Sequence, residues 1–451
     1  MHMEKTIGII GAGLAGSQAA LTLAHNGMRV RLFEMRPYVQ TDVHRSDKCA
    51  ELVCSNSLKS TKPDTAAGML KDELDVLGAD LYKVALECRV PAGGALAVNR
   101  HAFSDAVTEL IVQNERIDLI RGEISSLDDV CDCDAIVIAT GPLTSDALGR
   151  SLTDALGCTS MAFYDAAAPI VSAESLDRSR IFSQSRYEEG EGDYLNAPLD
   201  KEEYEAFITE LLGAQRVVAK EFESKELFQA CQPIEEIARK GFDAPRFGCM
   251  KPVGLVDPRT GRRPWAAIQL RAEDAHGSSY NLVGFQTNLT FPEQDRVFRL
   301  IPGFEQAEFF RHGVMHRNTF INAPLFLDTA LACKVLSTRY GLPVYAAGQF
   351  CGTEGYVEAI RSGLHVALSI MQEFSGLCIP LPEETAFGAL LSYATNPETR
   401  DYQPSHVNFG LMPPLTKRIK GKAERYAAYA ERGRIAIRDY AQSLIDAGIE
   451  F

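Results

Sequence analysis

Two cysteines occupy settings in which a thiol could act as a nucleophile. Cys54 lies in the polar run CSNS at residues 54–57, shortly before an expected helix, where nearby amide dipoles would favour the thiolate. Cys231 is followed by Pro233, which prevents a continuous helix, and then by Glu235 and Glu236. A thiolate can add to an electron-poor carbon and so divide a difficult reaction into two easier steps. From the local pattern alone, a buried and inert thiol is the favoured interpretation of each cysteine.

The elements near the N-terminus indicate where a cofactor would be held. The apolar run 6–10 is expected to form a buried parallel strand, residues 17–26 a helix, and residues 29–34 a second strand that ends in Glu34. The loop between the first strand and the helix reads Gly11-Ala12-Gly13-Leu14-Ala15-Gly16. A GxGxxG loop between a strand and a helix, followed by an acid at the end of the next strand, is typical of dinucleotide-binding folds.

Each residue of this pattern has an expected task. Gly11 would make a tight turn, Gly13 would let backbone amides approach a pyrophosphate, and Gly16 would let helix and strand touch. Glu34 would accept a hydrogen bond from a ribose hydroxyl. The pattern predicts a site for an adenine dinucleotide and leaves NAD and FAD both open.

A similar arrangement returns late in the chain. Residues 342–348 are expected to form another buried strand, and a glycine turn at 352–355 precedes a helix at 356–374. Gly348, Gly352 and Gly355 could bring a second helix N-terminus to the flavin end of the same dinucleotide, or the region could house a separate nicotinamide site. Because a clean second GxGxxG is absent from the sequence, we favour the first interpretation.

The order of these elements predicts an α/β fold. We expect a Rossmann-like FAD-binding domain of the glutathione-reductase type, divided between residues 1–170 and 325–451. Residues 134–142 form a strand that returns beside the first, and residues 89–96 are a glycine-rich linker. Residues 171–324, rich in turns and short alternating strands, predict an inserted α+β substrate domain. The end of the chain is expected to be helical.

Composition narrows the class of protein. The chain has 451 residues, of which 46% are hydrophobic, and a formal net charge of −14. No apolar stretch reaches the roughly 18 residues of a membrane span, and no signal-peptide pattern precedes the first strand, so a cytoplasmic protein is expected. Eleven cysteines, an odd number, fit a reduced compartment, and their spacing predicts no metal site.

Three basic segments stand out in this acidic chain. They comprise Arg259 to Arg263, Arg311 to Arg317 with two histidines at 312 and 316, and Lys417 to Lys422. Each could be a solvated face, and together they are consistent with a polyanionic partner.

Longer motifs along nearly the whole chain resemble one family. They are ELVCSNS at 51–57, RVPAGGALAV at 89–98, YDAAAPIV at 164–171, MKPVGLVDPR at 250–259, LVGFQT at 282–287, VMHRNT at 314–319, EGYVE at 354–358 and NFGLMPP at 408–414. These motifs resemble, in the same order, the bacterial folate- and FAD-dependent tRNA (uracil-5-)-methyltransferases, the TrmFO family.

The resemblance implies formation of 5-methyluridine in the T loop of tRNA. The carbon would come from 5,10-methylenetetrahydrofolate, and the reduction from FAD that NADPH or NADH regenerates. A thiolate adding to C6 makes C5 of uracil nucleophilic, a base then removes the C5 proton, and reduced flavin supplies a hydride. The family's two cysteines fall on Cys54 and Cys231. Their individual roles stay open, with Cys231 favoured near the base and Cys54 by the flavin.

The same resemblance makes the first glycine loop, Glu34 and the second glycine turn FAD contacts, and makes tRNA the partner rather than DNA or a membrane. Two pairs depart from the family pattern, Phe350-Cys351 and Ile360-Arg361, and we expect them in the flavin and folate wall. The alternatives are the same chemistry on 23S ribosomal RNA, a non-methylating FAD-dependent NAD(P)H oxidoreductase, and a tRNA-binding partner with a structural flavin.

Overall fold

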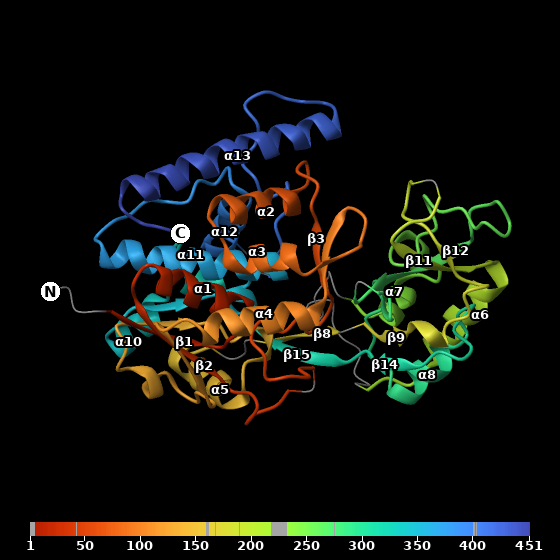
Figure 1. Cartoon of the computed structure of the whole chain (residues 1–451), viewed down its shortest axis with the longest axis horizontal. Coiled ribbons are helices and arrows are strands. Elements are labelled where there is room, and N and C mark those ends of the chain that lie inside the picture. The colour runs from red at the N-terminus through yellow and green to blue at the C-terminus, as the bar shows by residue number, and fades with distance from the viewer. Residues whose placement is uncertain are drawn as a thin grey trace.

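A five-stranded parallel sheet combines four strands from the first part of the chain with one from the last part, in the order β16-β7-β1-β2-β6 (Figure 1). The computed structural model describes residues 5–41, 43–158, 162–166, 168–188, 190–217, 232–274, 276–399, 402 and 404–451. The strands are β1 (Thr6–Ile10), β2 (Arg29–Glu34), β6 (Ile117–Arg121), β7 (Ala135–Ile138) and β16 (Val344–Ala346). The predicted strand that returns beside the first is confirmed, because β7 pairs with β1.

Two helices cross closely on this sheet because glycines leave room for them. They are α1 (Leu14–His25) and α11 (Tyr356–Phe374), and α1 begins three residues before the expected helix start. A Cβ on Gly16 would overlap the carbonyl oxygen of Gly11, and one on Gly363 would overlap that of Ala15. Because α1 follows β1 and α11 follows β16 in the same parallel sheet, both helices begin at the edge where the carboxyl ends of the strands converge.

A small antiparallel sheet and three helices follow β2. The sheet has the order β3-β5-β4, with β3 (Ser57–Ser60), β4 (Arg89–Val90) and β5 (Ala95–Val98), and the helices are α2 (Ala66–Val76), α3 (Asp80–Glu87) and α4 (Arg100–Val112). The prediction that 89–96 is only a glycine-rich linker is wrong, because it forms a hairpin. The short β4 and β5 run antiparallel on either side of the turn.

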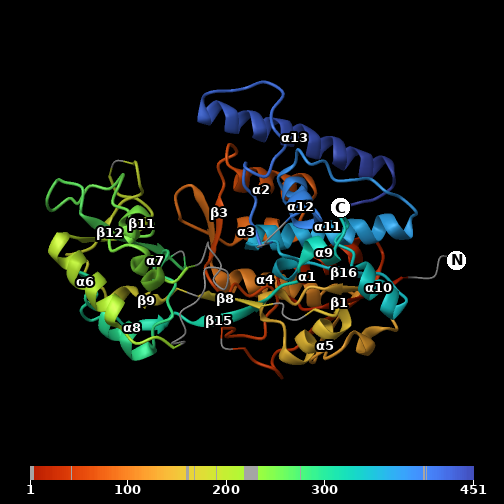
Figure 2. The same ribbon diagram turned by 180° about the vertical axis from the view of Figure 1, so that it is seen from behind.

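The middle of the chain builds a separate lobe around a six-stranded sheet of order β10-β11-β12-β13-β9-β14 (Figure 2). The strands are β9 (Ile170–Ser172), β10 (Phe182–Ser183), β11 (Tyr194–Leu199), β12 (Ala266–Ala272), β13 (Ser279–Leu282) and β14 (Phe309–Arg311). Helices α6 (Lys201–Gly213), α7 (Ile234–Lys240) and α8 (Phe291–Phe298) cover it and share its own hydrophobic core. The chain enters and leaves beside the antiparallel pair β8 (Ala162–Ala166) and β15 (Met315–Thr319). The domain boundaries at 170 and 324 stay a prediction.

The remaining helices complete the first lobe. They are α5 (Asp146–Leu156), α9 (Ala323–Phe326), α10 (Lys334–Tyr340), α12 (Ala386–Thr395) and α13 (Lys422–Asp446), and the last two confirm the helical C-terminal region. The fold is thus α/β and Rossmann-like, with an inserted α+β lobe. Among the helices that the structure describes, none is both long and apolar enough to cross a membrane.

Candidate active site

The first glycine loop forms an open cradle at the end of β1. Gly11 has φ +102°, and Gly13 is the N-cap of α1 with φ −72°. A Cβ on Gly13 would meet no described atom within 4 Å, whereas one on Gly16 would overlap backbone. The first-turn amides of α1 have no partner inside the helix and point toward this space. Open space over Gly13 beside a helix N-terminus fits an anionic pyrophosphate.

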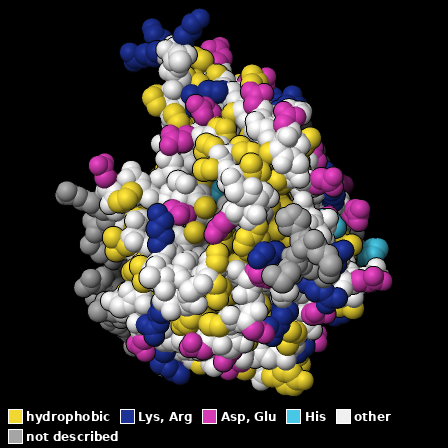
Figure 3. Space-filling view, turned by 90° about the vertical axis from the view of Figure 1, so that its left-hand side faces the viewer, with side chains coloured by type: hydrophobic (Ala, Val, Ile, Leu, Met, Phe, Trp, Pro, Cys, Tyr) yellow, Lys and Arg dark blue, Asp and Glu magenta, His cyan; other side chains and the backbone are white. Residues whose placement is uncertain are grey.

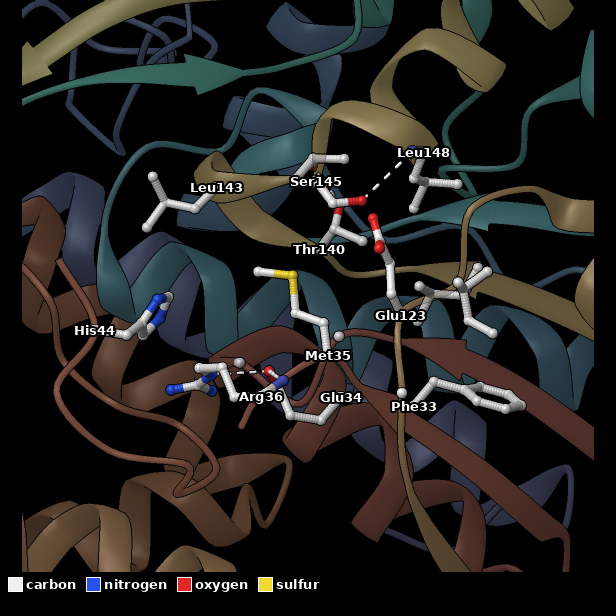
Figure 4. Close-up of a pocket in the computed structure, with 16 residues that line it drawn as sticks. Phe33, Glu34, Met35, Arg36, His44, Glu123, Thr140, Leu143, Ser145 and Leu148 are labelled. Carbon is white, nitrogen blue, oxygen red and sulfur yellow. Dashed lines mark hydrogen bonds and ion pairs between the residues drawn. The ribbon is translucent and has the colours of Figure 1, made fainter. Parts of the chain in front are cut away.

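A pocket continues from this cradle toward the end of β2. Figure 4 shows Glu34 and Arg36 on one side, Thr140 and Ser145 on the other, and Met35 between them. His44 also lines it, and its Nδ1 lies 2.7 Å from Thr41 Oγ1. Burial and the charge of Arg36 lower the pKa of His44 to about 4, so this imidazole is neutral at pH 7. The pocket offers hydrogen-bonding groups beside apolar walls, as a nucleoside requires.

Glu34 is held by a buried ion pair. Its Oε1 accepts hydrogen bonds from the Arg36 backbone N (3.1 Å) and Nε (2.8 Å), and its Oε2 accepts one from Ala12 N (3.1 Å). Burial alone would raise the pKa of Glu34, but the hydrogen bonds and charge of Arg36 hold it below its ordinary 4.5. Arg36 also donates to Glu51 Oε2 at 2.9 Å. The acid predicted for ribose is therefore tied to the loop that leads to Cys54.

The second glycine turn lies against the first glycine loop. A Cβ on Gly348 would stand 3.1 Å from the Ala15 methyl, and Gly348 N donates to Ser362 Oγ on α11 at 2.7 Å. Gly355, with φ +122°, is the N-cap of α11, and the buried carboxylate of Glu358 fills the space that its side chain would take. Gly348 thus lies against the first glycine loop, whereas the N-terminus of α11 at Gly355 is occupied by the Glu358 carboxylate. The assignment of both turns to one dinucleotide stays a prediction.

Cys54 lies beside the start of α11. Its backbone N and that of Ser55 donate to Tyr356 Oη, at 2.8 Å and 3.1 Å. Burial first, and then Cys54, raise the pKa of Tyr356 well above its ordinary value, so the phenol keeps its proton. Figures 1 and 2 place β3, which follows this loop, on the side of the first lobe that faces the inserted lobe.

Three arginines converge on the same loop. Arg100 Nη1 donates to Leu52 O at 3.0 Å, and Arg311 Nη2 donates to Val53 O. Arg271 donates to Ser55 Oγ at 2.7 Å and to Asn56 Oδ1 at 2.8 Å. Cys54 interacts electrostatically with all three guanidinium groups. Because positive charge stabilises a thiolate, this is a setting for a nucleophilic sulfur.

Several sequence expectations need correction. Arg311 is not part of a surface patch, since it is 8% exposed and buried against the Cys54 loop. Phe350, Cys351, Ile360 and Arg361 are fully buried, so they do not line an open flavin or folate wall. Arg361 instead lies 3.5 Å from Glu73 and packs over the Phe387 ring.

Cys231 lies outside the described residues, so its place in the site stays a prediction. Sequence reasoning missed Arg36, Arg100 and Arg271. The only local signal for Arg271 is a charge within the apolar run AAIQLRA at 266–272. Among the described residues, no group of three or more His, Cys, Asp or Glu could hold a metal ion.

The fold and the two glycine turns define a Rossmann-like dinucleotide-binding protein with an inserted lobe. Residues 6–377 match the family model of glucose inhibited division protein A. Over its full length, the chain resembles two solved crystal forms of Aquifex aeolicus GidA, with TM-scores of 0.69 and 0.68 at 15% and 16% identity. Both alignments cover 98% of this chain, and they cover 79% of the chain in crystal form I and 75% of the chain in crystal form II. At such identities the likeness shows the fold alone.

Closer relatives define the family. The chain is 50% identical over 433 residues to the methylenetetrahydrofolate–tRNA-(uracil-5-)-methyltransferase TrmFO of Moorella thermoacetica, covering 95% of this chain and 97% of the relative. It is 48% identical to the enzyme of the same name from Heliobacterium modesticaldum, covering 98% and 99%. The chain therefore belongs to the TrmFO family.

The cradle can be tested by two glycine replacements with opposite consequences. In Gly13→Ala the new methyl meets no described protein atom, so the free protein should unfold at the wild-type temperature. The methyl would fill the space over the pyrophosphate, so FAD affinity should fall roughly tenfold or more, equivalent to about 1.4 kcal/mol. Gly16→Ala should instead destabilise the fold by about 1–3 kcal/mol. Flavin titration and thermal unfolding measure the two effects, and full FAD affinity in Gly13→Ala would contradict the assignment.

The Glu34–Arg36 pair predicts an acid-dependent contribution to stability. The folded pKa of Glu34 lies below its unfolded value, so the contribution is complete above about pH 4.5 and is lost as the pH falls through the folded pKa. Glu34→Gln should lower the free energy of unfolding by about 3 kcal/mol at pH 7, and by less at pH 3.5. Urea unfolding measures both values, with the exposed Glu87→Gln as the control. An equal loss at the two pH values would refute the assignment.

Proposed function

We propose that this chain is the folate- and FAD-dependent methyltransferase that forms 5-methyluridine in the T loop of tRNA. The methylene carbon comes from 5,10-methylenetetrahydrofolate. Close relatives over the full chain carry that enzyme's name. The observation that carries the proposal is the position of Cys54, whose backbone N donates to Oη of Tyr356, the first residue of α11 and the residue that follows the second glycine turn. We infer that the dinucleotide cradle and the thiol meet at this edge of the sheet.

The cofactor residues follow from this geometry. The first glycine loop would bind the pyrophosphate of FAD, Glu34 the ribose, and Gly348, Gly352 and Gly355 the isoalloxazine end. The orphan amides of α1 and the open space over Gly13 fit the group. When bound, reduced flavin supplies the hydride that converts an exocyclic methylene into a methyl group. We further propose that NADPH or NADH restores the reduced flavin without a second dinucleotide fingerprint.

The chain's own residues supply the remaining chemistry. A thiolate that adds to C6 makes uracil C5 nucleophilic, and C5 then attacks the methylene carbon of the folate. Loss of the C5 proton to a base expels tetrahydrofolate and leaves an exocyclic methylene, and the thiolate leaves C6 when that methylene is reduced. The arginines around Cys54 favour the thiolate, and Tyr356 fixes the backbone that carries it. By family resemblance Cys231 is the second cysteine, with Cys231 favoured at the base and Cys54 at the flavin. We place the reaction in the cytoplasm.

The direct test is incubation of the purified protein with a T-loop transcript, labelled methylenetetrahydrofolate and NADPH. Labelled 5-methyluridine is the expected product, and its absence would refute the methyltransferase. Cys54→Ala should reduce labelling at least about a hundredfold, since either a nucleophile or a base is lost. The exposed Cys378→Ala is the matched control and should keep wild-type activity. Greater labelling of 23S ribosomal RNA fragments than of tRNA would instead favour that substrate.

A basic segment offers a surface for the RNA backbone. Lys417, Arg418, Lys420 and Lys422 are exposed in the loop before α13 and at its start. Figure 3 shows Lys and Arg side chains gathered at the top of the molecule, where this loop lies in Figure 1. In the 259–263 segment, Arg259 is paired with Asp257, whose Oδ2 lies 2.9 Å from Arg259 Nη2, whereas Arg262 and Arg263 are exposed. We propose the 417–422 segment as a phosphate-binding surface for tRNA.

The double variant Lys417→Ala/Lys420→Ala tests that surface. Each lost phosphate contact should lower the slope of log K against log salt by about one, so the double variant should lose about two. FAD content should stay unchanged. Lys334→Ala, an exposed lysine on α10 at the far side of the first lobe, serves as the control. Filter binding over a salt series measures the slopes, and an unchanged slope in the double variant would exclude the segment.

A further inference from the structure

The charges around Cys54 come largely from the inserted lobe. Arg271 lies on β12 and Arg311 ends β14, whereas Arg100 begins α4 of the first lobe. Arg100 is itself tied across the lobes, because its Nε donates to Glu273 Oε2 at 2.6 Å. The inserted lobe therefore supplies two guanidinium groups to a loop that belongs to the first lobe, and one carboxylate to Arg100 beside it.

Arg271 makes the most direct of these contacts. It is 7% exposed and donates to the side chains of both residues that follow Cys54. Asn56, which is fully buried, in turn donates to Val98 O at 3.1 Å and to Ala272 O at 2.9 Å. Arg271 thus binds the loop immediately after the thiol, and Asn56 connects this part of the loop to both lobes by hydrogen bonds.

The local charge balance is positive. The groups that face Cys54 are Arg100, Arg271, Arg311 and Tyr356, with Glu273 beside Arg100 and Arg271, Tyr194 beside Arg271 and Arg45 beside Arg311. Burial lowers the pKa of Arg271 and of Arg311, and Cys54 acts in the opposite direction on both. Burying a cationic group is costly unless negative charge accompanies it. A thiolate at Cys54 would therefore relieve the cluster, whereas a neutral thiol would not.

We propose that Arg271 is a positioning residue that docks the inserted lobe on the Cys54 loop and holds the sulfur in a field that favours its thiolate. Activation of the thiol then depends on a residue outside the dinucleotide fold. The inserted lobe would therefore favour the thiolate form of Cys54 as well as pack against its loop. The use of that thiolate in methylation rests on the proposed function, whereas the effect of Arg271 on the thiolate form of Cys54 does not.

The test is the pH profile of Cys54 alkylation in the full flavin-bound protein. Iodoacetamide is added in pulses from pH 5 to 10, and modification of Cys54 is quantified by peptide mass spectrometry. In Arg271→Gln the midpoint should rise by about one pH unit or more, which corresponds to roughly tenfold slower alkylation on the acidic side of the profile. Arg271→Lys, which keeps the charge but not the two-point contact, should give an intermediate midpoint.

Controls separate this effect from general destabilisation. Arg361→Gln also removes a buried arginine, from the pair with Glu73, and should leave the Cys54 profile at the wild-type position. If Arg271→Gln does not fold, Arg311→Gln removes a charge from the same loop and should shift the midpoint in the same direction. A profile that superimposes on the wild-type curve would overturn the proposal.

The outcome is independent of the proposed function, because alkylation needs neither tRNA nor folate. A wild-type protein that fails to methylate tRNA but shows the Arg271-dependent shift would refute the function and keep this inference. Methylation of tRNA together with an unshifted alkylation profile in Arg271→Gln would support the function and refute this inference.

Discussion

Buried positive charge at the junction of the two lobes is the constraint on which the candidate site depends. A guanidinium group removed from water needs acceptors on several sides, and the loop at 52–56 supplies them from its carbonyls, Ser55 and Asn56. The conformation of the loop accordingly places these acceptors within hydrogen-bonding distance of Arg100, Arg271 and Arg311. Because Cys54 is part of this loop, the position of its thiol depends on the docking of the inserted lobe.

A further buried arginine connects this junction to the first glycine loop. Arg36 binds Glu34 at the end of β2 and Glu51 at the start of the cysteine loop. Because both acids share one guanidinium group, the end of β2 and the cysteine loop are parts of one hydrogen-bonded unit. The close contact of Ala15, at the start of α1, with Gly363, two turns into α11, completes it by fixing the two helices against each other. The three constraints together explain why residues far apart in sequence form one site.

Local patterns are sufficient to predict most of the strands and helices around the first glycine loop. Strands β1 and β2 and helix α11 match their predicted bounds, because apolar runs, glycine turns and a terminal acid are local signals. The hairpin of β4 and β5 was missed, since its partner strand β3 lies far along the chain. The burial of Arg311 and Arg361 was also missed. A charged side chain looks solvent-exposed in sequence, and only the folded chain brings Val53 or Glu73 against it.

A crystal structure of the protein with FAD bound would test most directly whether cradle and thiol converge. We expect the pyrophosphate over Gly13, the ribose at Glu34, and the isoalloxazine against the turn at 348–355, with Cys54 Sγ lining the same cleft as the ring. An isoalloxazine ring directed away from that turn, with Cys54 walled off from it by protein, would contradict the central claim.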